Sequence, residues 1–184
     1  MLFRQSFALM SPGGQGARLQ VLIFHRVLLS ADPLFPQEVD AARFDRICGW
    51  LRAWFNVLPL DEAVRRLSAG TLPARSLAIT FDDGYADNHD IALPILRRHG
   101  LTATFFIATG YLDGGRMWND TIIESIRHSA LDAIDLQDVQ DVQGMSLGAH
   151  SLLTLAQRRA AIDTIIPRVK HLPAARRQIG RAHV

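Results

Sequence analysis

Two neighbouring carboxylates, Asp82 and Asp83, are the residues of this sequence best suited to chemistry. They follow a short apolar run, Ser76–Phe81, and precede Gly84, which lets a backbone turn sharply beside a ligand. Adjacent carboxylates repel each other, and a bound divalent cation relieves that repulsion. One carboxylate can then hold the cation while the other accepts a proton from an attacking water. The alternative interpretation is a plain turn, because Asp-Asp-Gly is also a turn signal.

The segments around this acidic pair predict a βαβ unit. The run Ser76–Phe81 is typical of a buried strand, residues 87–99 of a helix that Gly100 would end, and Thr102–Ala108 of a second apolar strand. This order implies parallel pairing with a right-handed crossover. Functional side chains of parallel α/β units gather where the strands end, and the acidic pair lies at such an end.

The rest of the chain predicts further elements of the same class. The apolar run at 19–27 favours a buried strand, and the helical period of Phe44, Ile47 and Leu51 favours a helix. The expected elements are a lead-in at 1–19, a loop at 31–36, helices at 41–54, 118–127 and 156–169, a helix capped by Asp61 and ended by Gly70, and a kink at Pro94. Residues 131–148 receive no assignment.

Three stretches together resemble a known family. Leu77–Tyr85 (Leu-Ala-Ile-Thr-Phe-Asp-Asp-Gly-Tyr), Pro94–Leu96 and Ala103–Ile107 (Ala-Thr-Phe-Phe-Ile) are similar to the first half of a polysaccharide deacetylase, or NodB-homology, domain. Ile23–Val27 resembles the strand that opens many bacterial members. The resemblance covers residues 20–128. It implies an α/β fold, a partial distorted (β/α) barrel over residues 20–178.

The resemblance also implies an activity. Family members are metal-dependent hydrolases that remove N-acetyl groups from amino-sugar polysaccharides, so the expected partner is such a polymer. By position, Asp82 would be the general base and Asp83 a ligand of a divalent metal, usually zinc. Tyr85 would help to shape the sugar-binding site. The alternative interpretation is that Tyr85 is simply part of the turn and has no role in binding.

The chain departs from the family pattern in its histidines. The family completes its metal site with two histidines four residues apart, a spacing that lets both imidazoles meet one ion. Here His150 fits the first position, but Thr154 stands where the second histidine is expected, and a loop or surface role for His150 is the favoured interpretation. For His25, a buried or supporting histidine is favoured over a ligand. The segment that would carry the general acid is not recognisable.

The ends of the chain are interpreted separately. Residues 179–184 are what a sequencing-adapter string would encode, so we expect an artefactual tail on a truncated member; a natural basic tail is the benign alternative. A complete (β/α) barrel needs about 250 residues. Met1–Met10 is a poor secretory signal, so a cytoplasmic location is the default expectation. No apolar stretch is long enough for a transmembrane segment.

Composition narrows the function classes. The chain has 184 residues, 48% of them hydrophobic, which is ample for a core and excludes a disordered chain. Residues 157–184 hold seven of the 20 basic residues and one of the 18 acidic ones, but no aromatic residues interleave the arginines, so no nucleic-acid surface is expected. Cys48, the single cysteine, is expected to be a buried thiol.

Two other functions remain alternatives. A non-catalytic carbohydrate-binding relative would hold glycan without metal dependence. A phosphotransfer domain would use the acidic pair to bind magnesium, but no partner motif accompanies the pair, and Lys170 is the only lysine.

Overall fold

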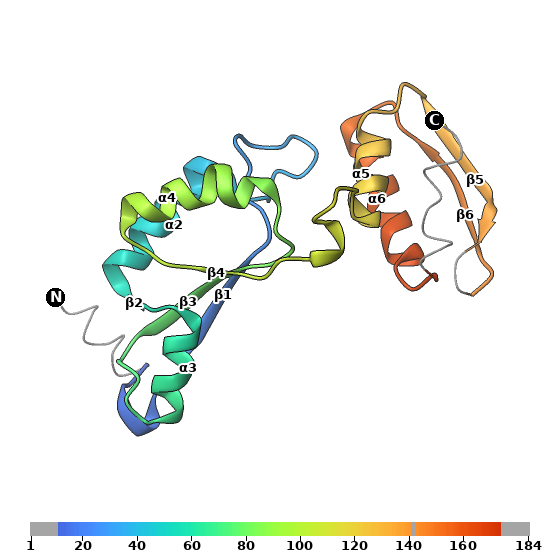
Figure 1. Cartoon of the computed structure of the whole chain (residues 1–184). Helices are drawn as coiled ribbons and strands as arrows, with labels where there is room; N and C mark the ends of the chain where they lie inside the picture. Colours follow the sequence, from blue (N-terminus) through green and yellow to red (C-terminus); the bar gives the residue numbers. More distant parts are fainter. Residues whose placement is uncertain (1–10, 141–142, 174–184) are drawn as a thin grey trace. The chain divides into compact units, whose positions relative to one another are not determined.

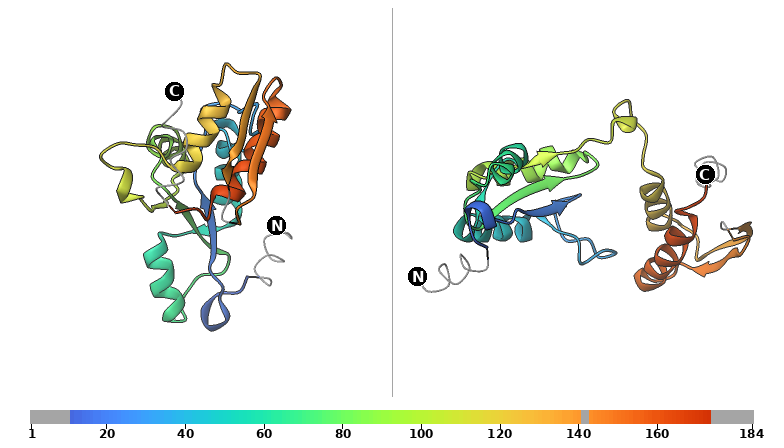
Figure 2. Two further views of the ribbon diagram at one scale, coloured as in Figure 1. Left: turned by 90° about the vertical axis from the view of Figure 1, so that its right-hand side faces the viewer. Right: turned by 90° about the horizontal axis from the view of Figure 1, so that it is seen from below.

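The computed structural model describes residues 11–140 and 143–173, which form two compact units (Figures 1 and 2). The first unit contains residues 11–32 and 37–109, and the second contains residues 33–36 and the described residues from Gly110 onward. The suspected tail at 179–184 lies outside the described residues. Across residues 11–140 and 143–173, no helix has the length and apolar character needed to cross a membrane.

A small parallel sheet forms the centre of the first unit. Its strands are β1 (Gln20–Phe24), β2 (Asn56–Val57), β3 (Ser76–Phe81) and β4 (Thr104–Phe105). Each of the other three strands pairs in parallel with β3. Every residue of β3 is buried, as expected for the central strand of a parallel sheet, which is covered on both faces. The α/β class predicted from the sequence is confirmed, and the parallel sheet is consistent with part of a deacetylase-type barrel.

Two helices, α2 (Ala41–Trp54) and α4 (Leu93–His99), pack with β1 and β3 in one core. The buried residues of α2 recur at helical spacing, at Phe44, Cys48 and Leu51, so this helix buries a single stripe. The side chain of Asp40 accepts a hydrogen bond from the Arg43 amide and caps the helix start. A further helix, α3 (Leu60–Ser68), contacts β3.

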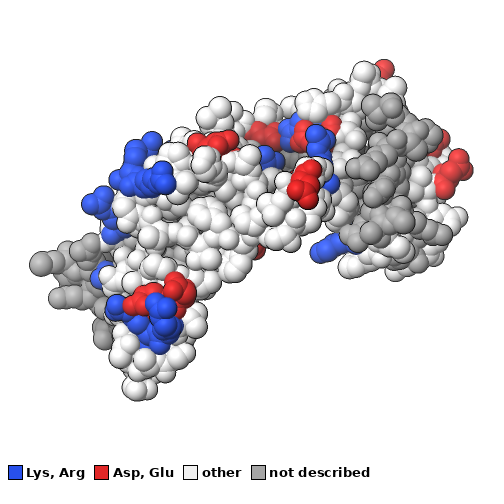
Figure 3. Space-filling model, viewed as in Figure 1, with Lys and Arg blue, Asp and Glu red and all other residues white. Residues whose placement is uncertain are grey.

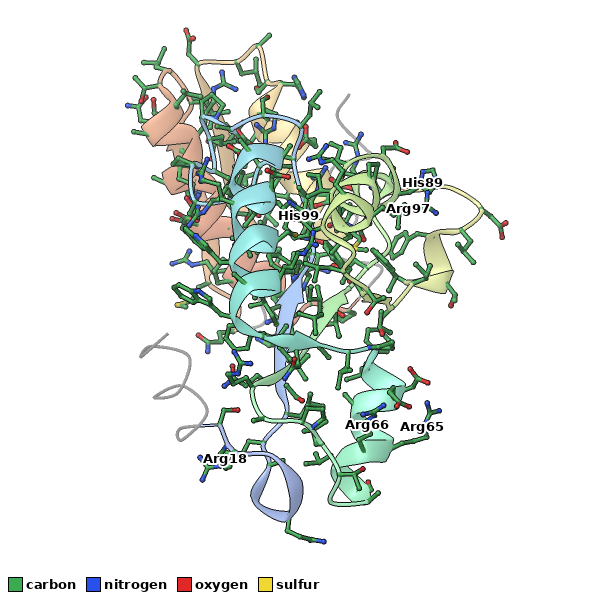
Figure 4. The ribbon with its side chains drawn as sticks, turned by 90° about the vertical axis from the view of Figure 1, so that its left-hand side faces the viewer. Arg18, Arg65, Arg66, His89, Arg97 and His99 are labelled. Carbon is green, nitrogen blue, oxygen red and sulfur yellow. The ribbon has the colours of Figure 1, made fainter. Side chains whose placement is uncertain are left out.

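A polar contact also joins α2 to α4. Asp45 Oδ1 accepts a hydrogen bond from Arg98 at 2.8 Å and lies 2.9 Å from Nε2 of His99, which Figure 4 labels. The pKa of Asp45 is lowered, first by the hydrogen bond from Arg98 and next by the one with His99. The carboxylate therefore stays ionised where it ties the two helices together.

The crossover between β3 and β4 differs from the uniform helix expected at 87–99. It begins as a π-helical turn, η2 (Asn88–Ala92), and continues as α4. Pro94 lies in the first turn of α4, directly after the π-helical turn, at a position where a missing N–H is tolerated. Gly100 ends α4 in the left-handed conformation, at φ 62°, as predicted.

Other boundaries also differ from the sequence-based expectations. The strands expected at 19–27 and 102–108 are shorter, and α3 begins at Leu60 after Pro59 with no side-chain cap, so the cap predicted at Asp61 was wrong. The described part of the lead-in, 11–19, contains a short turn, η1 (Gly14–Gly16), that is held against the loop before β3. The Gly14 amide donates to the Leu72 carbonyl at 2.9 Å.

The second unit is a hairpin packed on two helices. Strands β5 (Ala133–Gln140) and β6 (Ser146–Ser151) pair antiparallel, and α5 (Trp118–Arg127) and α6 (Leu155–Val169) contribute to the same core. A short turn, η3 (Thr109–Tyr111), precedes α5. Most of the hairpin lies in the stretch left unassigned from sequence, because the three-residue step from Leu136 to Val139 interrupts the alternation expected of a strand.

Arginines of α6 fasten the second unit together. Arg158 donates to the carbonyl oxygens of Ile126, Arg127 and Ser129, which lie at the end of α5 and just beyond it. A cation near these carbonyls complements the negative end of the helix. Arg159 lies over the Phe35 ring, 4.5 Å from its centroid, and thereby holds the segment 33–36 in this unit.

Candidate active site

A row of phenylalanines supports the carboxyl edge of the sheet. Phe24, Phe81 and Phe105 are register partners at the ends of β1, β3 and β4. Their rings stack in sequence, with centroids 5.3 Å apart for Phe24 and Phe81 and 5.0 Å apart for Phe81 and Phe105. Phe44 of α2 meets the first two rings edge-on. This close-packed layer fixes the point at which the acidic pair begins.

Backbone hydrogen bonds hold the acidic pair on both sides. The Asp82 amide donates to the Phe24 carbonyl at 2.9 Å, so pairing with the β1 side continues one residue past β3. On the other side, the Ala108 amide donates to the Asp83 carbonyl at 3.3 Å. Asp82 and Asp83 are therefore anchored between the ends of two neighbouring strands, as the position of the pair in the sequence predicted.

The backbone turns sharply through two consecutive left-handed residues. Asp83 has φ 75° and Gly84 has φ 74°. This conformation is ordinary for glycine and uncommon for any other residue, although Asp tolerates it better than most. Uncommon backbone conformations persist where the surrounding structure enforces them, and they cluster at active sites. Nothing in the sequence at Asp83 indicated this conformation.

Both carboxylates are partly buried and accessible. Tyr85 follows them, also partly buried, and the guanidinium of Arg26 lies 4.6 Å from the centroid of its ring. His25 is exposed and directly follows Phe24, so it lies at the strand end next to Asp82. The structure thus brings Asp82, Asp83, Tyr85 and His25 to one edge of the first unit.

Two polar residues at this edge, Arg26 and Asp87, received no role in the sequence analysis, and the contacts of Asn88 were not foreseen. Asp87 accepts a hydrogen bond from Arg26, and the Asn88 amide group donates to the His25 carbonyl. The partners are about 60 positions apart in the chain, so no local pattern connects them. The available signal was the polar character of the residues just beyond β1 and just before η2.

His150 lies in the second unit, on β6, although no strand was recognised there from sequence. Its Nε2 lies 2.8 Å from the Leu147 carbonyl oxygen. Thr154, which stands where a second histidine was expected, instead caps α6. Its hydroxyl accepts from the Gln157 amide, and the Gln157 side chain accepts from the Thr154 amide. This reciprocal pair is a capping box, which explains the threonine by helix formation.

The described residues do not complete a metal site. Within residues 11–140 and 143–173, no group of three or more His, Cys, Asp or Glu side chains is arranged to hold a metal ion. Two adjacent carboxylates are suitable ligands for a divalent cation, but a zinc site uses at least three protein ligands. The donor set around Asp83 therefore does not by itself fit a resident zinc ion.

Charged groups on α3 are paired with one another. On α3, Arg65 and Arg66 form ion pairs with Asp61 and Glu62, and Figure 3 shows acidic and basic side chains interleaved there. Such exposed pairs form a solvated helix face of mixed sign.

Comparisons with known proteins agree with the resemblance found in the sequence. A model of the family described as "Polysaccharide deacetylase" matches residues 69–166, more than half of the chain. The Bacillus subtilis (strain 168) protein named "Putative polysaccharide deacetylase YxkH" is 31% identical over 93 residues, which are 50% of this chain and 32% of that protein. The chain thus spans about a third of the length of this curated relative.

Solved structures of deacetylases also align with the chain. IcaB from Ammonifex degensii is 25% identical with a TM-score of 0.47, over 74% of this chain and 59% of IcaB. The Streptococcus pyogenes deacetylase PplD is 24% identical with a TM-score of 0.47, over 56% of this chain and 50% of PplD. The family match spans the acidic pair, the crossover and the strand that follows. This chain belongs to the polysaccharide deacetylase family.

Proposed function

We propose that this chain carries the base-bearing half of a site that hydrolyses N-acetyl groups on an amino-sugar polysaccharide. The proposal rests on the family and on the edge formed by Asp82, Asp83 and Tyr85. In this reaction a C–O bond forms between water and the acetyl carbon, and the C–N bond breaks. The products are acetate and a free amine on the sugar.

Asp82 is the proposed general base. Its carboxylate oxygen takes the proton of the attacking water, and the proton then passes to the departing nitrogen or to solvent. A base must be accessible to water and held in a fixed position. Asp82 meets both conditions, because its side chain is partly exposed and its amide is bonded to the carbonyl of Phe24.

Asp83 is the proposed ligand for a divalent metal, with zinc as our expectation. When bound, such an ion polarises an acyl oxygen and lowers the pKa of water. The described residues leave its ligand set incomplete, so the roles of Asp82 and Tyr85 are argued from their own positions. The ring of Tyr85, beside the acidic pair, offers an apolar face against which a sugar can pack.

The left-handed backbone at Asp83 is the observation that carries the proposal. A simple turn would be satisfied by glycine or asparagine there, without the cost of bringing two carboxylates together. Instead, an aspartate occupies a φ of 75° at the end of a fully buried strand. Uncommon geometry combined with like charges favours a functional site over a plain turn.

Acetate release from N-acetylglucosamine oligomers tests the proposal on the full chain. The assay is run with and without added Zn²⁺ or Co²⁺, and oligomer binding is measured in parallel. Because the ligand set within the described residues is incomplete, we expect only weak metal-stimulated release. Asp82→Asn should reduce what remains by at least about 100-fold, the scale of a lost general base, while oligomer binding survives. Release that is equal in wild type and Asp82→Asn would refute the assignment of the base.

A non-catalytic glycan-binding role is the second candidate. It is favoured by the absence of a complete ligand set within the part of the chain that the structure describes. It predicts oligomer binding that neither EDTA nor Asp83→Asn changes, with no acetate released. The same two assays therefore separate the candidates.

A further inference from the structure

We propose that Asp87 is a positioning residue for substrate binding, acting through Arg26 on the ring of Tyr85. This inference rests on the proposed function, because it assigns Tyr85 to the sugar. It goes beyond that function by adding Asp87, Arg26 and Asn88, to which the proposed function gives no role. We call these three residues the latch, because they join the end of β1 to the start of η2.

Asp87 uses both carboxylate oxygens on the β1 side. Its Oδ2 accepts from Arg26 Nε at 2.8 Å, and its Oδ1 lies 3.3 Å from the Val27 amide nitrogen, which donates to it. The Asp87 side chain is 10% exposed, while that of Arg26 is 41% exposed. The acidic member is thus the shielded partner, and a shielded, hydrogen-bonded ion pair holds its geometry better than an exposed one.

Arg26 transmits this fixed position to Tyr85. Its guanidinium is held by Asp87 on one side and lies 4.6 Å from the centre of the Tyr85 ring. Stacking of a guanidinium on an aromatic face orients both groups. Tyr85 directly follows Gly84, the last left-handed residue of the turn. The stacked arginine fixes the plane of the ring.

Asn88 supplies the second arm of the latch. Its Nδ2 donates to the His25 carbonyl at 2.9 Å and to Asp87 Oδ1 at 3.2 Å, and its side chain is buried. Asn88 also begins η2, and π-helical turns occur frequently at functional sites. Two hydrogen-bonded arms, linked to each other through Asp87 Oδ1, therefore join the strand end that carries His25 to the turn that follows the acidic pair.

The arrangement predicts which kinetic constant depends on Asp87. The backbone bonds of Asp82 and Asp83 run to the Phe24 carbonyl and from the Ala108 amide, and neither involves the latch. Loss of the Asp87 charge releases Arg26 and thus Tyr85, while the acidic pair keeps its anchors. Substrate binding should weaken and the chemical step should be largely preserved.

Kinetics on the full chain test this split. For Asp87→Asn we expect KM for an N-acetylglucosamine oligomer to rise about fivefold with kcat within about twofold, the scale of one cation–π contact. Asp90→Asn is the matched control, because Asp90 lies in the same turn and its partner His89 is exposed. Arg26→Met should also raise KM, and Arg26→Lys should raise it less. A fall in kcat at constant KM in Asp87→Asn would overturn the proposal.

An NMR measurement tests the contacts of the latch and does not depend on enzymatic activity. In the wild-type chain the side-chain protons of Arg26 should be shifted upfield by the Tyr85 ring, and Tyr85→Leu identifies that shift. We expect the shift to be lost in Asp87→Asn and retained in Asp90→Asn. An unchanged shift in Asp87→Asn overturns the latch even if acetate is released. A wild-type chain with the shift but with no acetate release overturns the proposed function and leaves the latch intact.

Discussion

Gly84 and Ile107 lie in direct contact at the turn that holds the acidic pair. A Cβ on Gly84 would lie 2.9 Å from Ile107 Cδ1, 3.1 Å from its Cγ2 and 3.4 Å from its Cα. The Cδ1 and Cγ2 atoms belong to a side chain that would have to shift, whereas 3.4 Å from the Cα is an ordinary contact. Glycine is therefore favoured at position 84 by its positive φ, and an added methyl group would also displace the Ile107 side chain.

Gly84→Ala should destabilise the chain by about 2 kcal/mol, since left-handed strain and crowding add. Gly100→Ala is the matched control, because Gly100 has φ 62° with nothing within 4 Å of its Cβ position. The difference between the two variants in urea unfolding measures the contact with Ile107. Equal losses would show that the contact contributes nothing.

Substitutions at Asp83 should separate stability from function. Asparagine accepts a left-handed backbone readily and removes the repulsion with Asp82. The free energy of unfolding of Asp83→Asn should therefore lie within about 0.5 kcal/mol of the wild-type value. Asp83→Ala should be less stable than Asp83→Asn by about 1 kcal/mol, because alanine resists a φ of 75°. Thermal melts check the order, and both variants should lose metal-stimulated acetate release. An Asp83→Asn variant that retains full activity would remove Asp83 from the proposed site.

The βαβ unit could be predicted from sequence because a fully buried strand, a capped helix and a second apolar run each leave a local signal. The position of Asp82 and Asp83 follows from that order. The latch could not be predicted, because Arg26 and Asp87 are 61 positions apart and their contact depends on the register of β1 against β3. The hairpin of β5 and β6 was missed because two polar residues separate Leu136 from Val139 in β5, which interrupts the alternation expected of a strand.

Acid should weaken the contact between α2 and α4. The hydrogen bond from Arg98 is the main cause that lowers the pKa of Asp45 below 3.8 in the folded chain. A group whose pKa is lowered on folding stabilises the protein above its unfolded pKa, and this stabilisation is lost as the pH falls through the folded value. Urea midpoints from pH 6 to pH 2 should therefore fall less steeply for Asp45→Asn than for wild type. Parallel curves would show that the contact is without energetic effect.

Cys48 should be inert in the native chain. Burial, and next the charge of Asp45, raises the pKa of its thiol to about 12, and the side chain is fully buried. The thiolate is the reactive form, so almost none is present at pH 8. Ellman's reagent should react with one thiol per chain in urea and with none in the folded protein. Rapid reaction without urea would show that α2 opens readily from the sheet.

Thr154 caps α6 and also stands where the family has its second histidine, and variants at this position show which of the two explains the residue. As the cap of α6, its hydroxyl accepts from the Gln157 amide, so Thr154→Ala should cost about 1 kcal/mol, and Thr154→Ser should retain most of that stability. Thr154→His would restore the histidine spacing of the family at the expense of the cap. Because Thr154 caps α6, Thr154→His should lose stability like the alanine variant and gain no Zn²⁺ affinity in calorimetry. Tight Zn²⁺ binding by Thr154→His would instead show that His150 can turn away from the Leu147 carbonyl to become a ligand.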